Sequence, residues 1–189
     1  MRVLIVFISL TLVGTVPCAF PADRQQASFA DAPSGFEWYV FEAGDSACLR
    51  PLEWFVKAEV KGDTAALFMS KENIDKEGKF ETGLSLNVIR KSHAKTGKSP
   101  SQYARAYLDE LVSAHDDAQR FENPPQDGMP GIGATYLDQK ASPPVVIYTF
   151  LLADDASDIL RIFILEAPQR EWAEVWARNE KILHCRIRR

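Results

Sequence analysis

The fold is decided by residues 145–165, which read VVIYTFLLADDASDILRIFIL. Val145 to Leu152 and Ile159 to Leu165 are two runs of strand-forming residues, and the segment between them is polar. Two such runs around a short polar turn predict a β-hairpin. Because neither run alternates with polar residues, we expect both strands to be covered on two faces. The hairpin is therefore predicted at the centre of a sheet on which helices pack.

Other strand-forming segments flank this hairpin. Residues 36–41 and 47–50 predict a first hairpin, with its turn at residues 43–46. In residues 55–60, Phe55, Lys57 and Glu59 alternate with Val56, Ala58 and Val60, a pattern typical of a half-exposed strand. Further strands are predicted at 64–70, 82–89 and 134–140, with a hairpin turn at Glu77-Gly78, and residues 184–188 are expected to form either a closing strand or an extended tail.

Two amphipathic helices complete the predicted elements. The first begins at Pro100, with Ser99 as its N-cap residue and Gln102 placed to close a capping box. The second is expected to begin at Pro168 and to bury two tryptophans against the sheet. The apolar positions of the first helix are Tyr103, Tyr107, Leu108, Leu111 and Val112, and the tryptophans of the second are Trp172 and Trp176.

Residues 113–134 show no clear element. Pro124-Pro125, Asp127-Gly128 and Pro130-Gly131 predict an irregular backbone. A loop of this length in a compact domain is either mobile or functional. We therefore expect this segment to be the most mobile internal part of the chain and to contact a partner. The residues expected in that contact are Phe121, Met129 and Ile132.

The amino-terminal segment has the pattern of a secretory signal peptide. Arg2 supplies a positive charge, residues 3–14 are apolar and uncharged, and the small residues Ala19 and Ala22 follow. The apolar stretch is shorter than the roughly 20 residues that a membrane-spanning helix needs. We therefore expect export and no stable membrane insertion once the signal has been cleaved.

This pattern divides the chain into three parts. Residues 1–22 are the predicted signal peptide, residues 23–35 a flexible leader, and residues 36–189 a single domain. Lipid attachment at Cys18 is not favoured, because Pro17 stands where lipoprotein signals carry a small residue.

Two cysteines, Cys48 and Cys185, lie beyond the predicted signal peptide. In an exported protein, such a pair predicts a disulfide that ties the first hairpin to the end of the last helix. Two buried free thiols are the alternative.

The charge pattern argues against a nucleic-acid-binding protein. The net charge is −4 and the sequence pI is near 5.4. The basic residues are scattered, except for a short group at the carboxyl terminus. Binding to DNA or RNA requires a basic patch or stripe, so nucleic acid is not an expected partner.

No local motif indicates catalysis, a metal or a cofactor. His93, His115 and His184 have no metal-ligand spacing among themselves or with the cysteines. Gly83-Leu84-Ser85-Leu86-Asn87 lacks the second glycine of a nucleophile elbow. The glycine-rich segment 128–133 precedes a strand and lacks the lysine of a phosphate-binding loop. We expect no catalytic residue, no metal site and no cofactor.

Three short patterns resemble the PsbP-like superfamily. They are Pro51-Leu52-Glu53-Trp54 after the first hairpin, Thr82 to Val88, and Ser99-Pro100-Ser101-Gln102-Tyr103 at the start of a helix. The resemblance spans about residues 36–188. It implies an α+β fold, an antiparallel sheet with packed helices in an α/β/α sandwich. The superfamily includes the photosystem subunit PsbP, a Ran-binding nuclear import factor and bacterial envelope proteins of unknown function.

Two functions follow as hypotheses. The resemblance implies a non-enzymatic binding or assembly module that docks on a larger envelope complex through a protein partner. With no transit peptide, a bacterial periplasmic or secreted protein fits best. The alternative is a small extracytoplasmic enzyme whose site is assembled from His93, His115, Asp116 and the loop around Met129. An enzyme requires a pocket with convergent titratable groups.

Overall fold

The computed structural model describes residues 30–126, 129–183 and 185–187. The predicted signal peptide and Cys18 lie outside these residues, as does His184. Ala32–Arg189 form one compact unit. Its described strands build a seven-stranded and a three-stranded sheet, in which all neighbours are antiparallel. The predicted fold class, α+β with an antiparallel sheet and packed helices, is confirmed.

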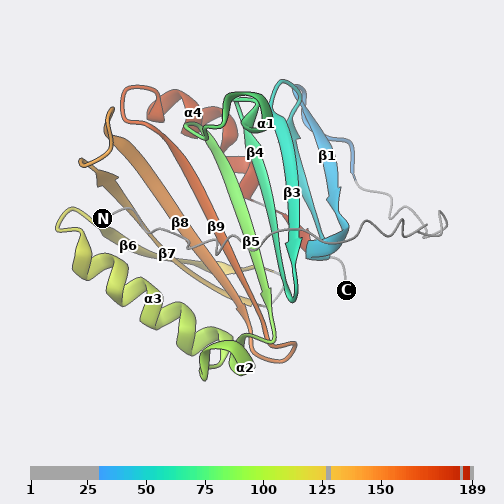
Figure 1. Cartoon of the computed structure of the whole chain (residues 1–189), viewed down its shortest axis with the longest axis vertical. Coiled ribbons are helices and arrows are strands. Elements are labelled where there is room, and N and C mark those ends of the chain that lie inside the picture. The colour runs from blue at the N-terminus through green and yellow to red at the C-terminus, as the bar shows by residue number, and fades with distance from the viewer. Residues whose placement is uncertain (1–29, 127–128, 184, 188–189) are drawn as a thin grey trace. The chain divides into compact units, whose positions relative to one another are not determined.

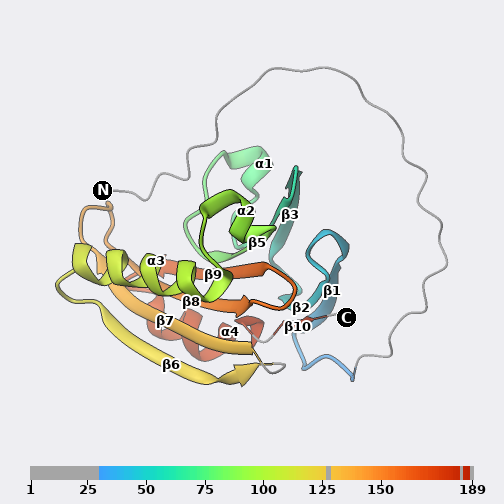
Figure 2. The ribbon, with the colours of Figure 1, turned by 90° about the horizontal axis from the view of Figure 1, so that it is seen from below.

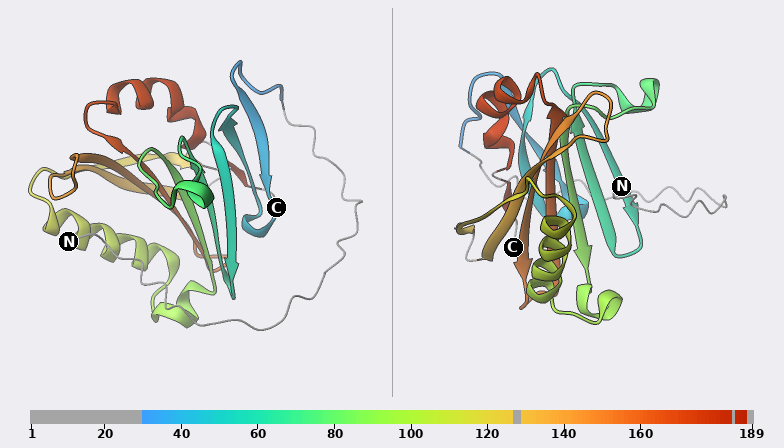
Figure 3. Two further views of the ribbon diagram at one scale, coloured as in Figure 1. Left: turned by 45° about the horizontal axis from the view of Figure 1, so that its top comes forward. Right: turned by 90° about the vertical axis from the view of Figure 1, so that its left-hand side faces the viewer.

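The larger sheet has the strand order β3-β4-β5-β9-β8-β7-β6, which can be followed by colour in Figures 1 and 3, from blue-green β3 to yellow β6. The predicted hairpin is β8 and β9, at the middle of this sheet as expected. The strands are β3 (Phe55–Lys61), β4 (Thr64–Ser70), β5 (Gly83–Arg90), β6 (Gln119–Gln126), β7 (Met129–Asp138), β8 (Val145–Asp154) and β9 (Ile159–Pro168).

The smaller sheet joins the two ends of the described unit. Its order is β1-β2-β10, so the last strand pairs with the second one. The pairing of Arg186 with Ala47 and of Ile187 with Ser46 confirms the closing strand, one of the two alternatives expected near the carboxyl terminus. The elements are β1 (Phe36–Phe41), the 3-10 turn η1 (Glu42–Gly44), β2 (Ser46–Pro51) and β10 (Arg186–Ile187).

Helices cover both faces of the larger sheet (Figure 2). On one face, α3 packs over β7 and β8 through Leu108 and Leu111, and over β8 and β9 through Ala104. On the other face, α4, η2 and the smaller sheet close the main core with side chains such as Phe163 and Ile182. The helices are α1 (Ile74–Glu77), α2 (Ser92–Thr96), α3 (Pro100–Ala114) and α4 (Trp172–Asn179), and the 3-10 helix is η2 (Glu180–Leu183).

The start of α3 is the one that the sequence predicts. The Ser99 hydroxyl accepts from the N–H of Gln102, and the Gln102 side chain accepts from the N–H of Ser99 at 3.1 Å. This capping box satisfies two of the helix's unpaired N–H groups. The start of the last helix is different: β9 continues to Pro168, and α4 begins only at Trp172.

The prediction of a long loop at residues 113–134 is wrong. Most of this segment lies in β6 and β7, which pair with each other, and β7 pairs with β8. Gly131, one of the glycines that suggested a loop, lies against the ring of Phe150, and Gly133 pairs with Phe121 and with Phe150 across the sheet. A bare glycine lets an aromatic ring lie over the strand, so the segment stays extended.

A smaller prediction is also wrong. Glu77-Gly78 is not a hairpin turn, because Asn73 caps the short helix α1 and Gly78 ends it with a left-handed φ of 66°. The basic segment with His93 forms the short helix α2, which Gly97 ends in the same way at φ 71°. In both segments a glycine with a left-handed φ ends a short helix.

Candidate functional site

The larger sheet has two edge strands, β3 and β6. Among the described strands, β3 pairs only with β4 and β6 only with β7. An edge strand presents backbone N–H and C=O groups that its own sheet does not use. Such an edge can accept a strand from another chain, so the two edges are the first places to look for a docking surface.

The β6 edge is poorly suited to pairing. Pro124 and Pro125 lie within the strand, and proline has no N–H to donate. The pairing of β6 with β7 also shifts register between Asn123 and Gln126. Prolines and irregularities of this kind protect natural sheet edges against unwanted pairing.

The β3 edge, in contrast, is regular. Its pairing with β4 runs without interruption from Phe55 opposite Ser70 to Lys61 opposite Thr64, and the strand contains no proline. The side chains of Phe55 and Val60 are 46% and 64% exposed, and the preceding Leu52 is 55% exposed. A regular edge with exposed apolar side chains is the geometry that strand addition uses.

The side chains of β3 divide between the two faces of the sheet. Phe55, Lys57, Glu59 and Lys61 share one face, because successive side chains of a strand point to opposite sides. Val56 shares the other face with Ala58 and Val60 and packs against the main core. One face of this edge is therefore mainly charged and the other apolar.

Ion pairs connect Lys57 on the charged face of β3 to Glu59 of the same strand and to Asp75 of α1. The Lys57 ammonium lies 3.0 Å from an Asp75 carboxylate oxygen and 3.2 Å from one of Glu59. Hydrogen bonds to Asp75 first, and then to Glu59, raise the pKa of Lys57 above its ordinary value. Lys57 is therefore cationic at neutral pH, and the signs along this face read plus, minus, plus at Lys57, Glu59 and Lys61.

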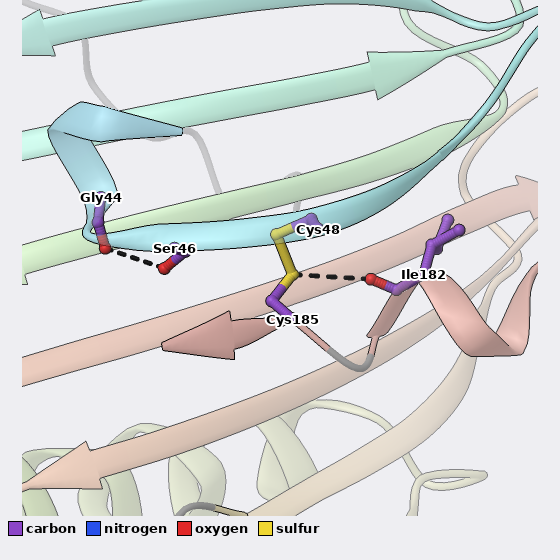
Figure 4. The surroundings of a disulfide bond; sticks show 5 residues. All are labelled: Gly44, Ser46, Cys48, Ile182 and Cys185. Atoms are coloured by element: carbon purple, nitrogen blue, oxygen red, sulfur yellow. Dashed lines mark hydrogen bonds between the residues drawn. A yellow bond between two sulfur atoms is a disulfide. The ribbon is translucent and has the colours of Figure 1, made fainter. Parts of the chain in front are cut away.

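The predicted disulfide is present (Figure 4). The Cα atoms of Cys48 and Cys185 lie 4.3 Å apart, and the bond closes a sequence separation of 137 residues. Cys48 lies in β2, and Cys185 stands between η2 and β10. Both residues are buried in the main core. The bond therefore fixes the pairing of β10 with β2.

A hollow of about 420 Å³ lies where the β8–β9 turn meets η1 and β10. Arg161, only 2% exposed, lines it together with the carboxylates of Asp45 and Asp154. Asp45 forms an ion pair with Arg90 at 2.7 Å, and Asp154 accepts from the N–H of Ser157. The wall of this hollow carries both positive and negative side chains, and both carboxylates already interact with other groups of the protein. The hollow therefore does not favour either an anionic or a cationic ligand.

The three residues expected to contact a partner lie in strands. Phe121 stacks on Tyr148 with ring centroids 4.7 Å apart, and Met129 is only 4% exposed in the main core. Ile132 is half-buried and packs against the two clusters beneath α3. Contact of a partner with these residues stays a prediction, and their side chains are chiefly used for packing.

The residues of the enzyme hypothesis are not brought together. His93 lies in α2, beside the start of α3, whereas His115 caps the other end of α3. The 15 residues of α3 separate these ends by about 22 Å. His115 instead lies against Tyr136, with ring centroids 4.0 Å apart, and burial raises the pKa of that phenol. Within the described residues, no group of His, Cys, Asp and Glu side chains could hold a metal ion.

Comparison with known proteins gives structural neighbours only. No family model matches the sequence, and no curated protein matches it. Similar solved structures include cyanobacterial PsbP (CyanoP) from Synechocystis sp. PCC 6803, at 12% identity and a TM-score of 0.48, covering 86% of this chain and 98% of that one.

Two further solved structures are similar. One is from Bacteroides thetaiotaomicron VPI-5482, at 8% identity and a TM-score of 0.48, covering 82% of this chain but 49% of that one. The chain thus spans about half of that protein. The other is PA94 from Pseudomonas aeruginosa, a protein of unknown function, at 8% identity and a TM-score of 0.44, covering 80% of this chain and 95% of that one.

Sequence reasoning did not single out β3 as a docking edge. The alternation of residues 55–60 predicts a half-exposed strand; the strand is confirmed, but it is more exposed than predicted, since Ala58 and Val60 on its apolar face are exposed too. That the strand lies at an edge depends on the order of all seven strands, which follows from pairings distant in sequence. The available signal was the mixture of exposed apolar and alternating charged residues in one short strand.

Proposed function

We propose that this chain is an exported binding module that docks on a protein of a larger envelope complex. The partner adds a strand along β3, so that main-chain hydrogen bonds supply affinity and the side chains of β3 select the partner. The single observation that carries this proposal is the uninterrupted β3 edge with exposed Phe55 and Val60. Binding rather than catalysis is favoured, because the titratable residues of the enzyme hypothesis lie at opposite ends of α3.

Export is supported by the bond between Cys48 and Cys185. Disulfides persist in oxidising compartments and are rare in reducing ones. The amino-terminal pattern of an apolar segment after Arg2 points the same way. Within the described residues, no helix is long and apolar enough to cross a membrane. A bacterial periplasm or the exterior of the cell is the compartment we propose.

A photo-crosslinking amino acid at Ala58 tests the proposal. Ala58 is exposed in the middle of β3, and Ala173, an exposed alanine of α4, provides a matched control. In living cells we expect a cross-linked product from position 58 and none from position 173. Mass spectrometry of the product identifies the partner. The proposal is wrong if position 58 gives no product, or if both positions give the same products.

A further inference from the structure

We infer that β3 is self-complementary and that its occupant is the β3 strand of a second copy of this chain. This inference rests on the proposed use of β3 as a docking edge, and it identifies the protein of the larger complex that pairs with this edge as a second copy of the same chain. Two copies related by a two-fold axis would pair their β3 strands antiparallel, with the same strand on both sides of the interface. The two larger sheets would then form one continuous sheet.

The charges of β3 select one register for this pairing. If the axis passes beside Ala58, Lys57 stands opposite Glu59 of the second copy, and Glu59 stands opposite its Lys57. Directly opposite residues of antiparallel strands point to the same face and lie close enough for their side chains to interact. Each lysine at position 57 therefore lies opposite a glutamate of the other copy, and each glutamate at position 59 lies opposite a lysine.

The neighbouring symmetric registers are unfavourable. An axis beside Lys57 places Lys57 opposite itself, whereas an axis beside Glu59 places Glu59 opposite itself and Lys57 opposite Lys61. Like charges that are directly opposed destabilise a strand pair. The charges on β3 hinder pairing with an arbitrary strand, but they favour pairing with the β3 strand of a second copy in a single register.

The apolar side chains fit the same register. On the other face of the sheet, Val56 stands opposite Val60 of the second copy, and Ala58 stands opposite Ala58. The exposed Val60 is thereby covered by another β-branched side chain. On the charged face, the exposed Phe55 stands opposite Lys61, whose aliphatic stem can lie along the ring.

Sedimentation velocity of the purified protein over a range of concentrations tests this inference. We expect a concentration-dependent dimer in the wild type. Lys57→Glu and Glu59→Lys each place like charges opposite one another twice, so each should raise the dissociation constant at least about tenfold. Lys140→Glu makes the same change in net charge as Lys57→Glu, but in the exposed turn between β7 and β8 and outside the interface, and should retain the dimer.

Mixing the two reversed variants provides the decisive measurement. A chain with Lys57→Glu and a chain with Glu59→Lys present only opposite charges to each other, so the mixture should form a heterodimer although each variant alone is monomeric. Circular dichroism of each variant establishes that it is folded. If the wild type is monomeric at every soluble concentration, or if its dimer is insensitive to both charge reversals, the inference is wrong.

A cysteine scan determines the register independently. Cα atoms of directly opposite residues lie about 4.5–5.5 Å apart, within the range of a disulfide. Ala58→Cys should therefore form cross-linked dimers under mild oxidation, whereas Val60→Cys alone should not. Photo-crosslinking separates this inference from the proposed function. A product with a different protein and none with a second copy contradicts self-pairing but retains the docking edge, whereas no product at position 58 contradicts both.

Discussion

Asp155 accepts two hydrogen bonds from Ser101, one from the backbone N–H at 2.8 Å and one from the hydroxyl at 2.6 Å. The β8–β9 turn thereby fixes the first turn of α3 onto the sheet. The carboxylate also lies where the partial positive charge of a helix amino terminus favours an anion. These hydrogen bonds hold the pKa of Asp155 below its ordinary value, and the bond from the Ser101 hydroxyl has the largest effect.

Asp155→Asn should destabilise the protein by about 1 kcal/mol at neutral pH. Since the pKa of Asp155 is lowered by folding, its contribution is present above the unfolded pKa of about 3.9 and disappears as the pH falls through the folded value. Urea unfolding at pH 7, 5 and 3 should thus show a difference between variant and wild type that persists at pH 5 and shrinks at pH 3. An equal difference at all three values would contradict this account.

Removal of the disulfide should have a larger effect. With a sequence separation of 137 between Cys48 and Cys185, the chain-entropy model gives about 4–5 kcal/mol, and losses on removing a native disulfide are typically about 2–5 kcal/mol. We expect Cys48→Ala, Cys185→Ala and the double variant to lose similar stability in chemical denaturation. Thiol titration of the oxidised protein without residues 1–22 should find no free thiol. Two free thiols per chain would contradict the bond.

The tryptophans should differ in their contributions. Trp54 is 3% exposed, whereas Trp176 is half-buried and lies against Tyr148 and Trp172 at ring-centroid distances of 4.8 and 5.5 Å. We expect Trp54→Ala to cost about 3–5 kcal/mol and Trp176→Ala about 2–3 kcal/mol, because less surface is buried at the second position. Denaturant melts that rank the two variants in the reverse order would show that α4 contributes more to the core than its exposure indicates.

Gly133→Ala should be more destabilising than Gly131→Ala. A Cβ at Gly133 would collide with the backbone oxygen of Thr149 and the ring of Phe121, whereas at Gly131 it would meet only side chains, those of Phe150 and Leu152. Side chains can shift but a paired strand cannot, so we expect a loss of about 1–3 kcal/mol at Gly133 and less at Gly131. Thermal melts of the two variants measure the difference.

The elements whose evidence is local could be predicted from the sequence. The β8–β9 hairpin follows from two apolar runs around a polar turn, and α3 follows from the capping box at Ser99 and Gln102. Local evidence failed for β6 and β7. Pro124 and Pro125 are tolerated in β6 because it is an edge strand. Gly133 is tolerated in β7 because the ring of Phe121 covers it. Both reasons depend on neighbours that only the folded sheet supplies.

The candidate docking edge could be predicted only in part. The alternation at residues 55–60 establishes a strand, and the charges at Lys57 and Glu59 can be read directly. Whether this strand is central or at an edge depends on β5 pairing with β9, which lies far along the chain. The second sheet was missed for the same reason, because β10 joins β2 only after the rest of the chain has brought them together.

The closure of the smaller sheet by β10 also determines the order in which the molecule can be completed. Synthesis proceeds from the amino terminus, so Cys48 is made 137 residues before Cys185. During that interval β1 and β2 lack their third strand, and the thiol of Cys48 lacks its partner. Every strand of the larger sheet is made in the meantime. Closure of the smaller sheet is thus a late step, and a nascent chain stalled between residues 48 and 185 leaves the thiol of Cys48 without its disulfide partner.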